Sequence, residues 1–156
     1  MQKITPCLFF HGNNLEEAFN FYATVFKDAK VNITRVPGGP GGETIVGDIT
    51  ILGQEFKALQ GDQLPFQFNE SISFYVSCDD QNEVDYYWSK LTANGGQESV
   101  CGWLKDKYGV SWQITPKKIF TMLADKDKAK VGRAMEAMMQ MKKIDLKKME
   151  DAFNGK

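Results

Sequence analysis

The side chains best suited to nucleophilic or metal chemistry are few and widely spaced. The chain has three cysteines, Cys7, Cys78 and Cys101, and a single histidine, His11. No two cysteines form a CxxC pair, and tight transition-metal sites need several converging imidazole, thiolate or carboxylate donors. We therefore expect reduced thiols and a surface or loop position for His11. Cys7 has no histidine placed to act as its base, so it is interpreted as a small buried thiol.

The densest glycine cluster, residues 37–42, is a candidate phosphate-binding loop. A nucleotide-binding glycine loop follows a strand and opens a helix, whose N-terminal amides hold the ligand. The segments on both sides of this cluster read as strands, because residues 31–36 and 44–52 are rich in β-branched and alternating apolar residues. The cluster is thus predicted to be a surface or rim loop, and no other segment supplies a Rossmann unit.

The composition is that of one ordinary globular domain. Of 156 residues, 42% are hydrophobic and 25% are charged, and 19 basic residues nearly balance 20 acidic ones. This balance gives no electrostatic reason to bind nucleic acid or an anionic membrane. The first residues form no secretory signal, and no later run approaches the length of a membrane span. We expect a cytoplasmic protein.

The order of predicted elements repeats. In the first half, residues 7–10 read as a strand, Asn14 and Glu17 as a capping box before a helix, and residues 31–36, 44–52 and 55–60 as strands. A type II′ turn is predicted at Gly53-Gln54. In the second half, residues 72–78 read as a strand, Asp80 and Glu83 as a capping box, and residues 101–105 and 110–115 as strands.

The two halves align at a constant offset of 66 residues, which pairs Glu17 with Glu83 and Tyr22 with Trp88. A self-similar strand, cap and helix at fixed spacing indicates a duplicated unit. Three helices are predicted after Pro116, over residues 119–123, 129–141 and 146–153. The sequence therefore predicts an α+β protein with two βαβββ modules, about 1–62 and 70–116, and a helical extension over 117–156. That extension is expected to pack on the same domain or on a dimer mate.

Several segments carry a family resemblance. They are residues 5–10, 16–18 with 21–22, 73–76, 101–106, 108–113 and 134–145, of which 108–113 (YGVSWQ) is the most specific. Together they resemble the PhnB-like branch, labelled 3-demethylubiquinone-9 3-methyltransferase-like, of the vicinal oxygen chelate superfamily. The resemblance implies that the two modules form a curved mixed sheet around a central cavity.

The resemblance also implies where a metal would bind, since metal-dependent members place His and Glu ligands on the first and fourth strands of each module. Those positions carry Cys7, Ala58 (Gln60 if the register slips by two), Ser73 and Gln113 in this chain. An alanine, a serine and an amide are poor donors for Zn, Fe or Ni. We therefore expect no catalytic metal and no cofactor, and we do not expect the methyl transfer that the label names.

What remains is a cavity for a small organic ligand. Its expected lining consists of Cys7, Gln60, Ser73, Tyr75, Trp103 and Gln113. Because side chains alternate along a strand, Ser111 should share the face of Gln113, whereas Trp112 should face the helix layer. The alternative is a metal-dependent lyase, isomerase or dioxygenase of the vicinal oxygen chelate type.

A homodimer is predicted from apolar surface on the extension. Val131, Met135, Met138 and Met139 form one stripe, and Leu146, Met149 and Phe153 form another. Each stripe needs an apolar partner, and two-fold dimers are the commonest assembly of soluble proteins. The competing account is that these helices wrap their own domain.

Overall fold

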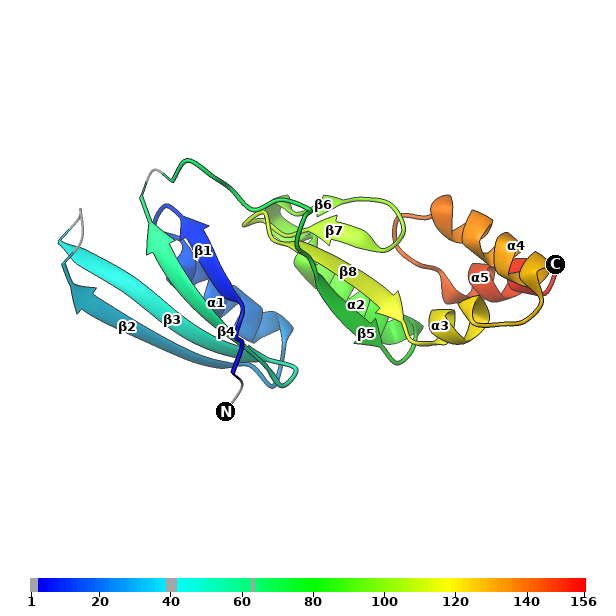
Figure 1. Cartoon of the computed structure of the whole chain (residues 1–156), viewed down its shortest axis with the longest axis horizontal. Coiled ribbons are helices and arrows are strands. Elements are labelled where there is room, and N and C mark those ends of the chain that lie inside the picture. The colour runs from blue at the N-terminus through cyan, green and yellow to red at the C-terminus, as the bar shows by residue number, and fades with distance from the viewer. Residues whose placement is uncertain (1–2, 39–41, 63) are drawn as a thin grey trace. The chain divides into compact units, whose positions relative to one another are not determined.

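A computed structural model describes residues 3–38, 42–62 and 64–156 of the chain (Figure 1). The chain divides into two compact units, residues 1–67 and residues 68–156, and each unit holds one four-stranded mixed sheet. The helices that follow residue 116 belong to the second unit. In the described part of the chain, no helix combines the length and the apolar character needed to cross a membrane.

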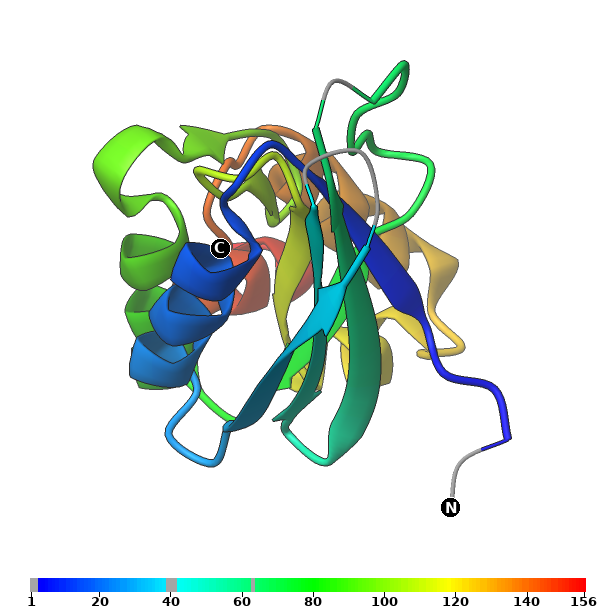
Figure 2. The ribbon, with the colours of Figure 1, turned by 90° about the vertical axis from the view of Figure 1, so that its left-hand side faces the viewer.

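The first unit is a βαβββ module. Strand β1 (Cys7–His11) and helix α1 (Leu15–Val25) precede strands β2 (Lys30–Pro37), β3 (Glu43–Ile51) and β4 (Gln54–Gly61). The strands lie in the order β1-β4-β3-β2, with β1 parallel to β4 and the other neighbours antiparallel. Helix α1 covers one face of this sheet (Figure 2).

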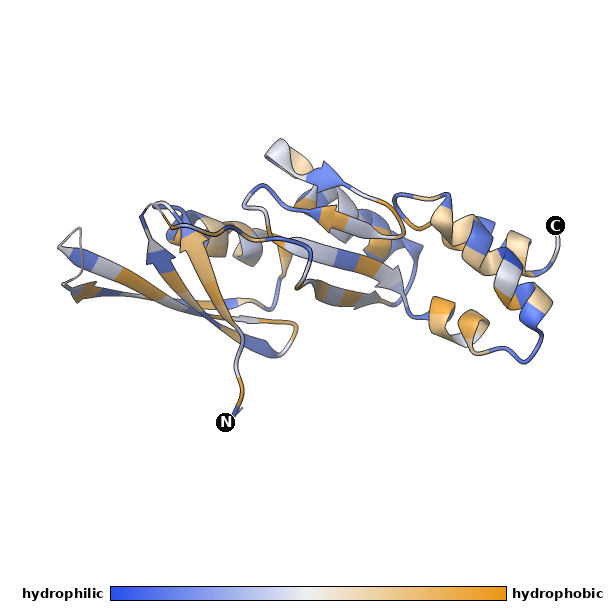
Figure 3. Cartoon of the chain, turned by 45° about the horizontal axis from the view of Figure 1, so that its top comes forward, coloured by the Kyte–Doolittle hydropathy of each residue, from blue (hydrophilic) through white to orange (hydrophobic). Residues whose placement is uncertain are grey.

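The face under α1 is the core of this unit. Phe10 and Ile49 are almost fully buried, and the Phe10 ring meets that of Phe19 edge to face with centroids 6.1 Å apart. Gly47 allows α1 to approach closely, because a Cβ there would lie 2.7 Å from the Phe19 ring. Strand β2 alternates polar and apolar residues, which appear as bands in Figure 3. This alternation is what fixes which face α1 covers.

The start of α1 differs from the predicted Asn14–Glu17 capping box. Asn14 makes no side-chain capping bond, and its Oδ1 is buried without a partner among the described residues. Instead, the backbone N–H of Leu15 donates to Oε1 of Gln60 at 3.3 Å. Nε2 of Gln60 donates to Oδ1 of Asn13 at 2.9 Å. A side chain of β4 therefore satisfies the first amide of the helix.

The two hairpins of this sheet also bear on the predictions. Strands β3 and β4 are joined at Leu52 and Gly53, whose φ angles are 48° and 79°, so the turn is type I′ at 52–53 and not type II′ at 53–54. The glycine cluster connects β2 to β3, and N–H of Gly38 donates to the carbonyl of Gly42 at 3.0 Å. Residues 39–41 lie outside the described part. The cluster joins two antiparallel strands, as predicted.

The second unit repeats the βαβββ module, with β6 as a short second strand. Strand β5 (Phe74–Cys78) and helix α2 (Gln81–Leu91) precede a 3₁₀ turn (Ala93–Gly95), β6 (Gln97–Glu98), β7 (Trp103–Lys105) and β8 (Ser111–Pro116). The order is β5-β8-β7-β6, with β5 parallel to β8. The predicted cap of α2 is confirmed, since Oδ1 of Asp80 accepts from the Glu83 N–H at 3.0 Å. Strand β6 was not predicted, because two residues show no alternation.

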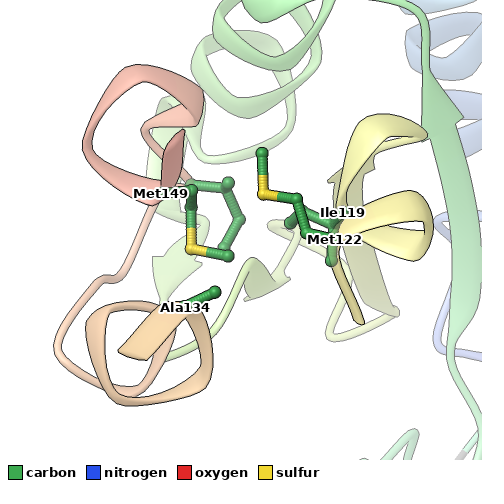
Figure 4. Close-up of a cluster of buried hydrophobic side chains, with 5 residues drawn as sticks. Ile119, Met122, Ala134 and Met149 are labelled. Atoms are coloured by element: carbon green, nitrogen blue, oxygen red, sulfur yellow. The ribbon is translucent and has the colours of Figure 1, made fainter. Parts of the chain in front are cut away.

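Helices α3 (Lys118–Leu123), α4 (Lys128–Met139) and α5 (Leu146–Phe153) complete the second unit. They enclose a buried cluster in which side chains of α3 and α5 face each other beside α4 (Figure 4). The cluster consists of Ile119, Met122, Ala134, Ile144 and Met149. Met138, Leu146 and Phe153 pack against it. The stripe of Leu146, Met149 and Phe153 thus finds apolar partners within its own unit, as does Met138 of the other stripe. Met139 is 63% exposed, and the homodimer stays a prediction.

Backbone hydrogen bonds tie the extension to the turn between β6 and β7. The N–H groups of Cys101 and Gly102 donate to the carbonyls of Met141 and Lys142, each at 2.8 Å. Cys101 and Gly102 have φ angles of 57° and 82°, which again makes a type I′ turn. The β6–β7 turn is therefore held by residues more than thirty positions further along the chain.

Candidate functional site

Helix α2 covers one face of the sheet of the second unit, and the opposite face is here called the open face. Phe74, Trp112 and Leu104 are directly paired across β5, β8 and β7 and lie on the face that α2 covers. Trp112 is 3% exposed, as the predicted alternation requires. The next residues along each strand must point the other way. They define the open face.

Four of the predicted site residues meet on the open face. Tyr75, Gln113 and Trp103 are direct neighbours across β5, β8 and β7. Nε2 of Gln113 donates to Oγ of Ser73 at 2.9 Å. Residues paired across strands have Cβ atoms about 4.5–5.5 Å apart, so one small molecule can touch all of them. The structure thus brings these four residues together on one face, and their role in binding stays a prediction.

Tyr75 combines a polar tip with an aromatic body. Its ring lies 5.8 Å from that of Phe120, centroid to centroid, and the residue is 43% exposed. Burial raises the pKa of the Tyr75 hydroxyl, and a hydrogen bond with Thr115 opposes this shift. The hydroxyl therefore stays protonated at neutral pH and can donate a hydrogen bond.

A pocket of about 150 Å³ opens beside this row of residues. Trp103 belongs to both the row and the pocket, and the remaining lining comes from residues 70–111 of the same unit, namely Glu70, Gln97, Glu98, Ser99, Leu104, Lys105 and Ser111. Ser111 is 2% exposed, and its Oγ has no hydrogen-bond partner among the described residues. A buried hydroxyl without a partner costs free energy, so this atom is a candidate contact for a polar group in the pocket.

An ion pair crosses the same pocket. Nζ of Lys105 lies 2.5 Å from Oε1 of Glu70, with side chains 32% and 62% exposed. The hydrogen bond from Lys105 lowers the pKa of the Glu70 carboxyl. Alternation predicted that Ser111 faces this side, but Lys105 and Glu70 were missed. Their contact joins residues 35 positions apart, and no local sequence pattern predicts it.

Asp106 organises the turn that leads into β8. It is 3% exposed, and its Oδ1 accepts from the N–H groups of Tyr108 and Val110 at 2.9 and 3.1 Å. Its Oδ2 accepts from Nε1 of Trp112 at 2.8 Å. The carboxylate thus fixes both the turn and the orientation of Trp112. This places Ser111 and Gln113 on the opposite face.

The first unit contributes Cys7, which differs from the expectation of a buried thiol. Cys7 is exposed on the face of its sheet away from α1. His11 lies on the same strand about 13 Å away at about 3.3 Å per residue, and its Nδ1 accepts from the N–H of Leu64 at 3.1 Å. The direct neighbour of Cys7 is Lys57, whose pKa is raised by its hydrogen bond to Asp48. Neither side chain is placed to deprotonate Cys7.

Gln60 is the predicted site residue that the structure places elsewhere. Gln60 pairs with Phe10 and Ala58 pairs with Leu8, and both rows lie on the α1 face. Lys57 and Leu59 share the face of Cys7 instead. A shift of one residue along a strand moves every side chain to the other face, so neither Ala58 nor Gln60 lies on the side of Cys7. Gln60 caps α1.

The donor set for a metal is correspondingly poor. Within residues 3–38, 42–62 and 64–156, no three His, Cys, Asp or Glu side chains converge closely enough to hold a metal ion. At the positions where the resemblance implies ligands, the side chains are a thiol, a hydroxyl and an amide. Such residues do not form a tight site for Zn, Fe or Ni.

Two βαβββ modules, each with α1 or α2 on one face of a four-stranded mixed sheet, define a vicinal oxygen chelate fold. The chain belongs to the family described as 3-demethylubiquinone-9 3-methyltransferase, which matches residues 2–115. The resemblance noted at 134–145 lies beyond that match. No curated protein matches the chain.

Two solved structures illustrate the relationship. A putative 3-demethylubiquinone-9 3-methyltransferase, PhnB protein, from Bacillus cereus is 37% identical, with a TM-score of 0.66 over 74% of this chain and 99% of its own. Protein PA1353 from Pseudomonas aeruginosa is 19% identical, with a TM-score of 0.61 over 74% of this chain and 98% of its own. The first is similar in sequence and fold, and the second is similar in fold.

Proposed function

We propose that the chain binds a small organic molecule on the open face of the second sheet, without a catalytic metal. The observation that supports this most strongly is the buried Ser111 hydroxyl in a pocket of about 150 Å³. A cavity of about this volume accepts a ring of roughly six heavy atoms. Trp103 offers an apolar surface, and few but defined polar groups surround it, as is typical of ligand sites.

Methyl transfer, which the family description names, is not the activity that we propose. The glycine cluster lies between antiparallel strands β2 and β3, where no helix N-terminus can receive the anionic or polar end of a nucleotide-like cofactor. A metal-dependent lyase, isomerase or dioxygenase is the weaker alternative, because the donor set is poor. The cavity expected between the two modules stays a prediction.

Ser111→Ala tests the proposal, because it should weaken binding without lowering the stability of the fold. Removing a buried hydroxyl that has no partner should leave the free energy of unfolding unchanged or raise it by about 1 kcal/mol. Binding of a ligand that uses this hydroxyl should weaken by about 1–3 kcal/mol, or roughly 5- to 150-fold.

The measurement is a thermal-shift screen of small organic acids, amides and alcohols, followed by calorimetric titration of each hit with wild type and variant. Ser89→Ala is the matched control, since Ser89 is exposed on α2 and its hydroxyl donates to the carbonyl of Tyr86. Gln113→Leu, with exposed Gln140→Leu as its control, tests whether the ligand extends to the Ser73–Gln113 pair. Hits whose affinity is the same in Ser111→Ala, Gln113→Leu and wild type would contradict the site.

A further inference from the structure

The strongest chemistry of the pocket lies in a second row of polar side chains. Gln97, Lys105 and Ser111 are direct neighbours across β6, β7 and β8, and all three line the pocket. The row presents an amide, an ammonium and a hydroxyl on one face. Because Cβ atoms of such neighbours are about 4.5–5.5 Å apart, Lys105 and Ser111 can both reach the two oxygens of one carboxylate.

The ammonium of Lys105 is the charged group of the pocket that a ligand can contact most easily. It belongs to a strand and is 32% exposed, whereas its partner Glu70 precedes β5 and is 62% exposed. Exposed ion pairs of this kind contribute little net stability. Glu70 can therefore be replaced at Lys105 by another carboxylate at small cost.

The other carboxylate of the pocket is already occupied. Oε1 of Glu98 accepts from Nε1 of Trp88 at 2.8 Å, and Oε2 lies 3.7 Å from Nζ of Lys142. Glu98 is thus directed toward α2 and balanced by a cation outside the pocket lining. When Glu70 leaves, the charge that remains for a ligand is positive.

We propose that the ligand of this pocket is a small carboxylate, which displaces Glu70 from Lys105 and accepts a hydrogen bond from Ser111. The inference rests on the proposed ligand-binding function and specifies its ligand class. Glu70 acts as an internal competitor that occupies Lys105 while the pocket holds no ligand. Trp103 contacts the apolar body of the ligand.

The test uses three probes of similar size that differ in charge: butyrate, butyramide and butylammonium. Titrations of the ¹⁵N-labelled full chain are followed by amide chemical shifts, which detect millimolar affinities. We expect butyrate to shift residues 97–111 with an affinity at least about tenfold higher than that of butyramide, from a charge-assisted bond worth about that factor. Butylammonium should not bind there.

Two glutamate variants make the test sharper. Glu70→Gln removes the competing charge and keeps the side-chain shape, so butyrate should bind about two- to tenfold more tightly. Glu43→Gln is the matched control, because Glu43 is an exposed partner of Arg35 in the first unit, with 3.3 Å between charged atoms. It should leave butyrate affinity unchanged. Lys105→Gln should abolish the preference for butyrate over butyramide.

The outcomes separate the two proposals. If butyramide or butylammonium shifts residues 97–111 as strongly as butyrate does, the ligand site stands and the carboxylate inference is wrong. If Glu70→Gln weakens butyrate binding, Glu70 is part of the site and the displacement is wrong. If none of the three probes shifts these residues, the pocket is not a ligand site and both proposals fail.

Discussion

Replacing Asp106 by asparagine changes one oxygen of a buried carboxylate into an NH₂ group and leaves the shape almost the same. Oδ1 can still accept from the Tyr108 and Val110 N–H groups. The new NH₂ then faces Nε1 of Trp112, which now donates at 2.8 Å to Oδ2. Two donors would point at each other in a site that is 3% exposed.

The expected cost follows from the loss of one charge-assisted hydrogen bond and from the burial of an indole N–H without an acceptor. Each is worth about 1–3 kcal/mol and they overlap, so we expect Asp106→Asn to lower the free energy of unfolding by about 3 kcal/mol. In urea titrations followed by far-ultraviolet circular dichroism, the midpoint should fall while the slope m stays constant.

A double-mutant cycle isolates the interaction. Trp112→Phe removes the indole donor and has its own packing cost, but in that background Asp106→Asn should cost about 1–2 kcal/mol less than in wild type. An Asp106→Asn cost below about 1 kcal/mol, or an equal cost in both backgrounds, would refute the account of this turn.

Other predictions concern a glycine, a thiol and the absence of metal. Gly102→Ala should lower stability by about 2 kcal/mol or more in the same urea assay, because φ is 82° and the new Cβ would lie 2.9 Å from the carbonyl oxygen of Ile114; an unchanged midpoint would contradict this. Burial raises the pKa of the Cys78 thiol from 9.0 to about 12, with smaller contributions from Glu83 and Asp79. The folded state therefore favours the neutral thiol, so this stabilisation is complete below pH 9 and is lost as pH rises toward 12. The stability difference between wild type and Cys78→Ala should shrink over that range, and a constant difference would show that the thiol does not titrate on unfolding. Protein purified without a histidine tag should contain well under one equivalent of Ni, Zn, Fe or Mn by elemental analysis, whereas one equivalent that is lost in Gln113→Leu would favour the enzyme alternative.

The sequence predicted what depends on neighbouring residues. Alternation alone separated Trp112 from Gln113 and placed Ser111 beside the latter, and the Asp80 cap was visible within four residues. These features can be predicted from the sequence because a single strand or a single turn determines each of them. The repeat of strand, cap and helix was legible for the same reason.

The predictions are wrong or incomplete where contacts between segments far apart in the sequence determine the structure. Asn14 has the residue type of a cap, but Gln60, 46 positions later, lies at the start of α1 and satisfies the Leu15 amide. Gln60 was also predicted to lie with Cys7, but it lies on the opposite face of the sheet. The register of β4 against β1 cannot be read from one strand alone. The Lys105–Glu70 pair was missed because it depends on how the segment before β5 returns to β7.

The backbone bonds that hold Cys101 and Gly102 have a consequence for how the pocket can vary among relatives. The family match ends at residue 115, yet the carbonyls that receive these two amides come from Met141 and Lys142. Glu98 and Trp103, on either side of this turn, belong to the pocket wall. A relative that ends at residue 115 must satisfy the two amides in another way, or let the β6–β7 hairpin move. Under the proposed function, we therefore expect substitutions in the segment between α4 and α5 to alter ligand selectivity without contacting the ligand.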